Sequence, residues 1–178
     1  WTHRLLHTRL FWPLHVFHHA AERFTVATTY RVHPLDLATG FLSKLIIPLL
    51  LGFRPDLVLA GAVVFKVQAL YAHSNLPEQP WLGRWLSFGP RGHGLHHSLD
   101  PRHRDRNFGS FVLWDRLFGT YLAVDGPQPA IGIDDGRERD LCLGQHPLRV
   151  MVVLQVDWAC GLLRAARSRF ARPADLSR

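Results

Sequence analysis

Two long apolar runs dominate the pattern of hydrophobic and polar positions along this chain. They cover residues 35–53 and 57–71, each carries a single lysine, and residues 54–56 (Arg-Pro-Asp) lie between them. Apolar runs of this length predict helices, and each is near the short end of the ~17–25 residues that cross a bilayer. We therefore predict a helical hairpin through a membrane over about residues 35–72. The alternative is a pair of buried core helices in a soluble protein.

Two shorter helices are predicted before the apolar runs. Residues 1–11 match the end of one helix, and Pro13 suits the first turn of a second helix that reaches Arg23. A bend at Trp12 and Pro13 would turn one face of each helix toward the other. The β-branched, polar residues 25–30 predict a loop.

The end of the chain is predicted to be a surface loop followed by a helix. Residues 125–144 are rich in proline, glycine and aspartate, which favours a loop. Residues 147–170 predict an apolar helix that gains arginines toward its end. This pattern is typical of a helix at an anionic membrane surface, and a peripheral tail is the alternative. The arginines are Arg164, Arg167, Arg169 and Arg172.

Composition and charge favour a membrane protein over a nucleic-acid-binding protein. The 178 residues are enough for one domain with a sizeable core. The formal net charge of +7 comes mainly from arginines scattered among apolar runs, whereas nucleic-acid-binding proteins gather basic residues in one patch. We therefore assign the positive charge to the cytoplasmic face of a membrane. Cys142 and Cys160 show neither metal-binding spacing nor a disulfide framework.

Eight of the twelve histidines gather in three short motifs. Histidines three or four residues apart lie on one face of a helix, and neutral imidazole is the commonest nitrogen ligand of zinc, iron and copper. Three such motifs predict a metal site, although a lone histidine is more often a hydrogen-bonded core or surface residue. Eight ligands exceed the four that zinc usually takes, so two adjacent metals fit better than one. The motifs are H-x-x-x-H at His3 and His7, and H-x-x-H-H at His15, His18 and His19 and again at His93, His96 and His97.

Further polar residues are candidates for the same site. His73 closes the second apolar run and is placed to complete a site at the membrane surface, where ionisable groups are functional candidates. His33 precedes a proline and is expected to be extended. A structural or hydrogen-bonding role is favoured for it over a ligand role. Asp105, Asn107 and Asp115 are available to hydrogen-bond the far nitrogens of ligand imidazoles, or they cap helices and turns.

In this order, the motifs resemble those of the fatty acid hydroxylase and sterol desaturase superfamily of membrane di-iron oxygenases. The resemblance covers about residues 1–121. The family's earlier transmembrane helices are missing, and the chain begins at Trp1 without a methionine or a signal peptide, so we expect an N-terminally truncated fragment. The matching segments are Trp1-Thr2-His3-Arg4-Leu5-Leu6-His7, His15-Val16-Phe17-His18-His19, Arg31-Val32-His33-Pro34, His73-Ser74-Asn75, Gly89-Pro90 before His93-Gly94-Leu95-His96-His97, Asn107-Phe108-Gly109, and Trp114-Asp115 through Phe118-Gly119-Thr120.

The resemblance implies an all-α integral membrane protein with a histidine-rich cap on the cytoplasmic side. Residues 1–125 would form the catalytic domain, and residues 126–178 the C-terminal loop and basic amphipathic helix. The cap would hold two iron ions, which zinc can replace during purification. It would use O2 to hydroxylate or desaturate a C–H bond of a sterol, fatty acyl chain or related lipid. The implied metal ligands are His3, His7, His15, His18, His19, His73, His93, His96 and His97.

Oxidation of a lipid C–H bond requires a suitable metal and a source of electrons. Oxidising an unactivated C–H bond needs a redox-active metal, which zinc is not, and imidazole-rich ligation suits iron without excluding zinc or copper. The chain carries no flavin or nicotinamide fingerprint. Electrons must therefore come from an external donor, cytochrome b5-like or ferredoxin-type, docked on the arginine-bearing face.

Two other functions stay open at this point. One is a metal-dependent hydrolase of a membrane lipid, which needs a carboxylate base near an open metal position. Glu22, Asp100 and Asp105 are the acidic residues closest to a histidine motif. The other is a non-catalytic metal-binding membrane fragment.

Overall fold

The computed structural model describes residues 1–86, 88–134, 136–144 and 147–170, whose regular elements are all helices, with no β-strand. The predicted all-α class is therefore confirmed for this part of the chain. The elements are α1 (Thr2–Leu6), α2 (Trp12–His19), the 3₁₀ helix η1 (Val26–Tyr30), α3 (Pro34–Phe41), the π-helical turn η2 (Leu42–Ile46), α4 (Ile47–Leu50), α5 (Pro55–Ala72), α6 (Pro80–Trp85), α7 (Pro90–His96), the 3₁₀ helix η3 (Pro101–His103), α8 (Val112–Leu117), α9 (Gly136–Leu143) and α10 (Pro147–Phe170).

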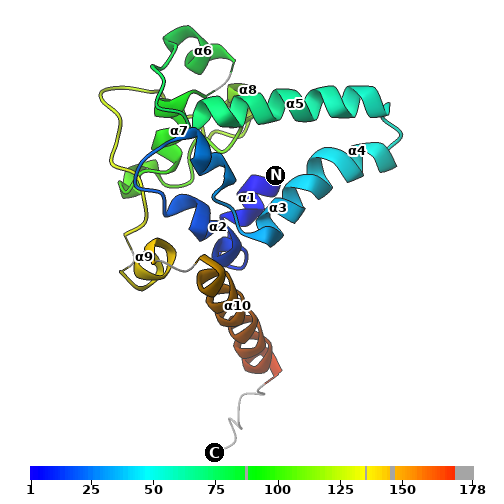
Figure 1. Cartoon of the computed structure of the whole chain (residues 1–178), viewed down its shortest axis with the longest axis vertical. Coiled ribbons are helices and arrows are strands. Elements are labelled where there is room, and N and C mark those ends of the chain that lie inside the picture. The colour runs from blue at the N-terminus through cyan, green and yellow to red at the C-terminus, as the bar shows by residue number, and fades with distance from the viewer. Residues whose placement is uncertain (87, 135, 145–146, 171–178) are drawn as a thin grey trace, which may run out of the picture.

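Figure 1 shows a body of short helices from which an arm and helix α10 project. The arm, residues 34–72, consists of α3, η2 and α4 as one helical run and of α5, which contacts η2 and α4. The turn between them passes through Gly52, whose φ of +83° suits glycine. Pro55 occupies the first turn of α5, where its missing N–H leaves no helical hydrogen bond unmade. These two residues allow the chain to reverse at the tip of the arm.

The surface of the arm is apolar and exposed. Among the described helices, α5 alone has the length and hydropathy of a membrane span, and only 11% of that stretch is buried. The alternative prediction of a buried core helix is therefore wrong for α5. At the tip, Arg54 and Asp56 form an exposed ion pair at 2.7 Å. The exposed apolar residues of the arm include Phe41, Leu42, Ile46, Leu50, Leu51, Phe53, Leu57, Leu59, Val63, Val64 and Val67.

The hydrophobic core of the body is formed by α2, near the beginning of the chain, and by α9 and α10, near its end. Val16 and Phe17 of α2 pack, together with Ala20, in one cluster with residues of α9 and α10. Those residues are Cys142 of α9 and Val150 and Leu154 of α10. Helix α10 has the predicted bounds. Of the four arginines predicted at its end, Arg164 is exposed, and Arg172 lies outside the described residues.

Helix α9 lies within residues 125–144, for which the sequence predicts only a loop. Its composition is polar, and packing against α2 accounts for the helix. Cys142 is buried in the shared core, and its carbonyl accepts a hydrogen bond from Arg31 at 2.5 Å. Arg139 pairs with Glu22 at 2.5 Å. These contacts with distant residues are invisible to a local pattern.

The first two helices are shorter than predicted. Helix α1 ends at Leu6 rather than near residue 11, and the backbone N–H of Thr8 then bonds the carbonyl of Leu5 at 3.0 Å in a tighter turn. Helix α2 ends at His19 rather than near residue 23. The predicted bend between them is present, since α1 and α2 contact each other.

Residues 26–30 form η1, capped by Thr25, where a loop is predicted over residues 25–30. The side chain of Thr25 and that of Thr28 each bond the other's backbone in a capping box. This reciprocal cap satisfies the first N–H groups of the turn and explains why β-branched, polar residues form a helical turn here.

Candidate metal centre

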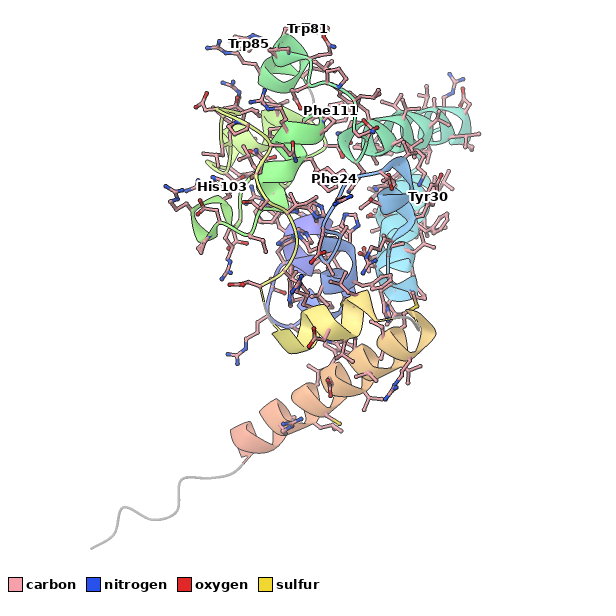
Figure 2. All side chains as sticks on the ribbon, turned by 60° about the vertical axis from the view of Figure 1, so that its left-hand side comes forward. Phe24, Tyr30, Trp81, Trp85, His103 and Phe111 are labelled. Carbon is pink, nitrogen blue, oxygen red and sulfur yellow. The ribbon has the colours of Figure 1, made fainter. Side chains whose placement is uncertain are left out.

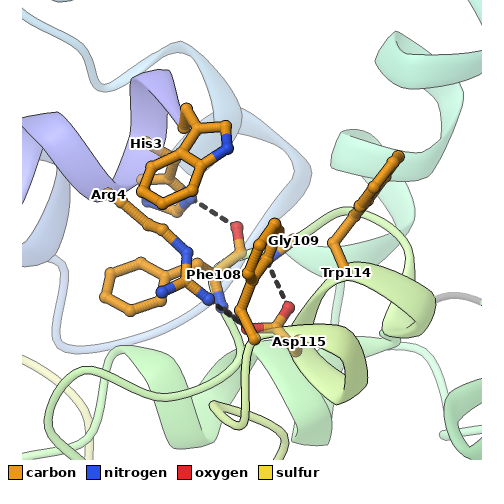
Figure 3. Close-up of a pocket in the computed structure, with 8 residues that line it drawn as sticks. His3, Arg4, Phe108, Gly109, Trp114 and Asp115 are labelled. Carbon is orange, nitrogen blue, oxygen red and sulfur yellow. Dashed lines mark hydrogen bonds and ion pairs between the residues drawn. The ribbon is translucent and has the colours of Figure 1, made fainter.

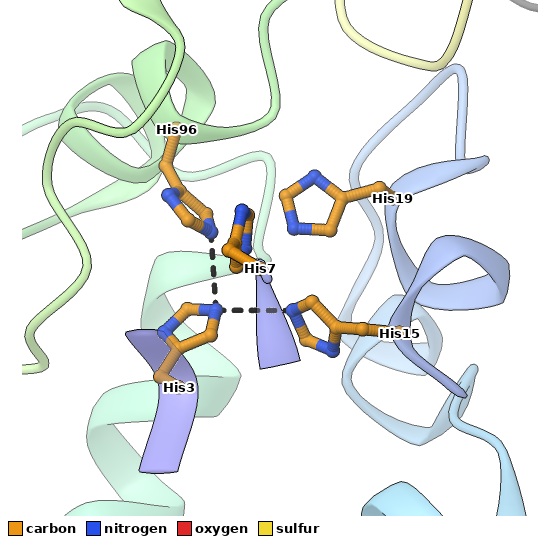
Figure 4. Close-up of side chains that lie close together, drawn as sticks. All are labelled: His3, His7, His15, His19 and His96. Atoms are coloured by element: carbon orange, nitrogen blue, oxygen red, sulfur yellow. Dashed lines mark hydrogen bonds between the residues drawn. The ribbon is translucent and has the colours of Figure 1, made fainter. Parts of the chain in front are cut away.

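The nine histidines predicted as ligands converge in two adjacent groups. Within each group, every residue offers a ring nitrogen within 4.8 Å of the others. The groups touch where the rings of His19 and His97 stack, with centroids 4.0 Å apart. His33 and His103 belong to neither group. The five-histidine group is His3, His7, His15, His19 and His96 (Figure 4), and the four-histidine group is His18, His73, His93 and His97.

The two H-x-x-H-H motifs contribute to the two groups in opposite ways. In α2, the first and last histidines join the five-histidine group, and the middle one joins the four-histidine group. At α7, the assignment is reversed. Residues four apart share a helix face, whereas the middle histidine is rotated by about 100° from the last. Each motif therefore serves both groups, and His3 and His7 of α1 complete one group while His73 after α5 completes the other.

Hydrogen bonds decide which ring nitrogen faces each group. The Nδ1 atoms of four histidines lie 2.7–3.3 Å from backbone carbonyl oxygens. Because a carbonyl only accepts, each of these Nδ1 atoms carries the hydrogen, and the Nε2 lone pair is left for the group. The carboxylate of Asp36 holds His15 in the same way at 2.7 Å. The carbonyl pairs are His3 with Phe108, His18 with Arg31, His73 with Ala69, and His96 with Arg106.

The Nε2 atoms held in this way face one another at distances that suit a shared metal ion. Nε2 of His3 lies 3.0 Å from that of His15 and 3.1 Å from that of His96 (Figure 4). All three rings carry their hydrogen on Nδ1, so lone pairs face lone pairs, and a cation between them would relieve the repulsion. Two nitrogens bound at a right angle, each about 2.1 Å from a metal, lie about 3.0 Å apart. The matching Nε2 distances in the four-histidine group are 3.1 Å for His73 with His18, 3.0 Å for His93 with His73 and 3.1 Å for His97 with His93.

Burial favours the neutral form of most of the grouped imidazoles. Desolvation is the largest cause that lowers the pKa of His96 to about 3 and the pKa of His73 to about 4. Neutral rings offer lone pairs to a cation without competition from a proton. Desolvation likewise holds the pKa values of five more grouped imidazoles well below the usual value, namely those of His3, His18, His19, His93 and His97.

Two more ring nitrogens are placed to bind a cation. The Nε2 atoms of His7 and His19 are buried and have no hydrogen-bond partner in the described structure. An unsatisfied buried polar group costs about 1–3 kcal/mol. Both atoms belong to the five-histidine group, so a metal there would satisfy them. The residues present therefore fit a metal centre.

Asp36 is the site residue that sequence reasoning missed. It lies in the first turn of α3, is buried, and holds Nδ1 of His15. Carboxylates that bond the far nitrogen of a ligand histidine fix its tautomer and raise its basicity. A signal was available, because Asp36 is the single acidic residue in the apolar run 35–53.

The polar residues predicted for this role act elsewhere. Asn107 donates to the carbonyls of Gly92 and Leu122. Asp115 accepts from the backbone N–H groups of Phe108 and Gly109. Both residues therefore fix the loop around residues 107–109 through backbone hydrogen bonds. This is the cap or turn role that was the alternative prediction for them.

Asp105 comes closer to the site than these two residues. Its carboxylate lies 4.0 Å from Nδ1 of His7, but its side chain is 65% exposed. It approaches the imidazole without making a hydrogen bond to it.

His33 has the predicted extended backbone and a structural role. It caps α3, and its Nδ1 accepts from the backbone N–H of Leu35 at 3.1 Å. The cap fixes the start of the helix whose first turn carries Asp36. His33 thus supports the site without belonging to either histidine group.

The acids considered as hydrolytic bases have other partners. Glu22 pairs with Arg139, and Asp100 bonds both the backbone and the side chain of Arg102. The Arg102 hydrogen bonds hold the pKa of Asp100 well below its usual value. Glu22 and Asp100 are thus held by arginines, and the third predicted acid, Asp105, is exposed. None of the three acids is therefore positioned as the base of a hydrolytic mechanism.

A pocket of about 370 Å³ opens beside the five-histidine group (Figure 3). Aromatic rings line most of it, and His3 forms part of its wall. Phe24 is partly buried, and Figure 2 shows Trp81 and Trp85 on α6 at the outer end of the body. Phe24 packs on His97 with ring centroids 5.1 Å apart. Aromatic rings therefore pack against both histidine groups.

Comparison with known proteins gives consistent matches. The family model described as fatty acid hydroxylase matches residues 1–120. The chain is 26% identical over 125 residues to alkylglycerol monooxygenase of Xenopus tropicalis. It is 33% identical over 122 residues to ornithine lipid hydroxylase OlsE of Rhizobium tropici, and 30% identical over 129 residues to cholesterol 25-hydroxylase of Homo sapiens.

These alignments cover most of this chain but less of the relatives. They include 68%, 67% and 69% of the chain, against 27%, 37% and 47% of the three relatives. The chain therefore spans less than half the length of each relative. No solved structure matches the chain significantly.

Proposed function

The chain belongs to the fatty acid hydroxylase family, and from that premise we propose that it forms the catalytic part of an O2-dependent lipid hydroxylase or desaturase. The observation that carries this proposal is the convergence of nine imidazoles in two adjacent groups. The printed names of the relatives, which refer to alkylglycerol, ornithine lipid and cholesterol, support a lipid as substrate.

We assign one iron ion to each histidine group, and all nine grouped histidines are the proposed ligands. Iron bound there would supply the O2 activation that oxidation of an unactivated C–H bond requires. The residues of the chain hold the site in place. Backbone carbonyls and Asp36 orient the imidazoles through Nδ1, and burial keeps water and protons away from the Nε2 atoms.

The reaction needs electrons from outside this chain. Hydroxylation places one oxygen atom of O2 in the substrate and releases the other as water, which consumes two electrons and two protons. A cytochrome b5-like or ferredoxin-type protein is the proposed donor. Exposed arginines on the body offer it a basic surface.

The arm supports association with a membrane. At 1.5 Å per residue, the 18 residues of α5 extend about 27 Å, close to the ~30 Å hydrocarbon core of a bilayer. The ion pair of Arg54 and Asp56 would reach water beyond the far side. Lys66 lies 3.7 Å from the ring centroid of Tyr30 in η1, so its charge sits at the base of the arm. We infer that the arm crosses the bilayer as a hairpin and that the histidine groups face the cytoplasm, where basic residues concentrate.

The decisive experiment is metal analysis of the full-length protein, purified anaerobically in detergent. About two irons per chain, together with incorporation of ¹⁸O from ¹⁸O₂ into a lipid product, are the expected results. Zinc with an oxygen-independent lipid product would favour a hydrolase. Bound metal without any lipid product would favour a non-catalytic metal-binding fragment, and well-folded protein without any metal would contradict the central claim.

A further inference from the structure

The pocket beside the five-histidine group lies between α1 and α8 (Figure 3). The aromatic rings of Trp1, Phe108, Trp114 and Phe118 line it. Its volume of about 370 Å³ is near the lower end of the ~300–1,000 Å³ that ligand pockets occupy. It is therefore large enough for a segment of a lipid and too small for a whole one.

The charged groups of this pocket already have partners. Asp115 accepts from two backbone N–H groups at 2.6 and 2.9 Å and from the hydroxyl of Thr120 at 2.5 Å. Arg4 donates to Thr120 at 2.6 Å, and its guanidinium lies 4.9 Å from the ring centroid of Phe108 and 5.1 Å from that of Phe118. An incoming molecule consequently meets aromatic surface in place of an available charge.

His3 connects the pocket to one histidine group. Its Nδ1 bonds the carbonyl of Phe108 at the pocket wall, and its Nε2 lies 3.0 Å from Nε2 of His15. One edge of the ring thus borders the pocket, and the other borders the five-histidine group. No member of the four-histidine group lines the pocket. A chain that fills the pocket ends beside the five-histidine group.

The outer face of α8 continues the apolar surface of the pocket. Leu113 is 64% exposed and Leu117 is 65% exposed, next to Trp114 at the pocket edge. The guanidinium of Arg116 is folded back onto the ring of Tyr121, 4.3 Å from its centroid. Exposed apolar surface of this kind next to a pocket marks contact with a membrane or an apolar ligand.

We propose that the pocket between α1 and α8 admits the hydrocarbon chain of a membrane lipid to the five-histidine group. This inference rests on the proposed function for the nature of the ligand. It adds the route of entry and the histidine group beside which the lipid is oxidised. The pocket recognises the lipid by its hydrocarbon chain, because the pocket presents no available charge to a headgroup.

The test is photo-crosslinking of the full-length protein in lipid nanodiscs with a diazirine-bearing hexadecanoate. Mass spectrometry should find saturable labelling of Phe108 and Phe118. Unlabelled hexadecanoate and hexadecanol should displace the probe equally well. Labelling confined to the arm, or displacement by the carboxylate alone, would overturn the proposal.

Two exposed tryptophans provide a matched pair of variants. Trp114 lines the pocket, whereas Trp81 of α6 does not. Trp114→Ala should lower labelling about three- to tenfold, as expected for one lost aromatic contact, and Trp81→Ala should leave it unchanged. Equal labelling in the two variants would contradict the route.

This experiment separates the route from the proposed function. Labelling requires neither a metal nor turnover. A labelled protein that contains no redox-active metal would refute the oxygenase and leave the route intact. An active oxygenase without labelling in the pocket would refute the route alone.

Discussion

The carboxylate of Asp36 lies 2.7 Å from Nδ1 of His15, so the first helix of the arm is tied directly to the five-histidine group. Because Asp36 is buried and His15 is a proposed ligand, this bond couples the position of α3 to the geometry of the centre. A movement of the arm would therefore change the position of the His15 imidazole at the proposed metal site.

Asp36→Asn keeps the shape of the side chain and removes its charge. We expect metal affinity to fall by about 10–100-fold, the usual loss for such a partner of a ligand histidine. Titration with a competing chelator measures this. Asp56→Asn at the exposed tip of the arm is the control and should bind metal like the unmodified protein. Unchanged affinity in Asp36→Asn would limit Asp36 to a packing role.

Removal of one imidazole from each group tests the proposed ligands. His96→Ala and His18→Ala should each lower the metal content and abolish oxidation, with membrane insertion retained. Elemental analysis and membrane fractionation measure the two outcomes. His103→Ala is the control, because His103 bonds Ser98 at 2.9 Å and belongs to neither group. Full metal content in either test variant would remove that histidine from the ligand set.

Asp115 is expected to contribute mainly to stability. Its buried carboxylate accepts from two backbone N–H groups and a hydroxyl, so Asp115→Ala leaves three donors without their acceptor. We expect a loss of at least about 2 kcal/mol in the free energy of unfolding.

A thermal melt in detergent, followed by circular dichroism, measures this loss as a lower Tm. Asp125→Ala provides the comparison, since Asp125 is exposed and its replacement should change stability by less than about 0.5 kcal/mol. Equal melting temperatures for the two variants would show that the Asp115 contacts add little.

A charge on the arm tests whether it enters the bilayer. Val63 lies in the middle of α5 and is exposed, so Val63→Arg should disfavour insertion by about 2.5–3.5 kcal/mol. The fraction of protein in carbonate-washed membranes should fall. Gln79→Arg, in the exposed segment before α6, should leave that fraction unchanged. Full retention of Val63→Arg would indicate that the arm does not span.

Helices that depend on contacts between distant residues escaped the sequence pattern. The bounds of α10 agree with the prediction because an apolar stripe marks a helix locally. Helix α9 has no such stripe, and its formation follows from the burial of Cys142 against α2. The role of Asp36 was missed for the same reason, since it depends on a contact with His15, a residue on another helix.

The ordered motifs of the sequence indicated the family, and its apolar runs indicated the helical class. Spacing along a helix placed the eight motif histidines on shared faces, whereas the full set of nine came from the family resemblance. How the nine histidines divide into two groups depends on the packing of the helices. His18 belongs to the four-histidine group, whereas its neighbours His15 and His19 belong to the five-histidine group. This division exists only when helices α1, α2, α5 and α7 are packed together. The same packing sets the Nε2 distances and brings the aromatic pocket against His3, since both result from helices that meet in space.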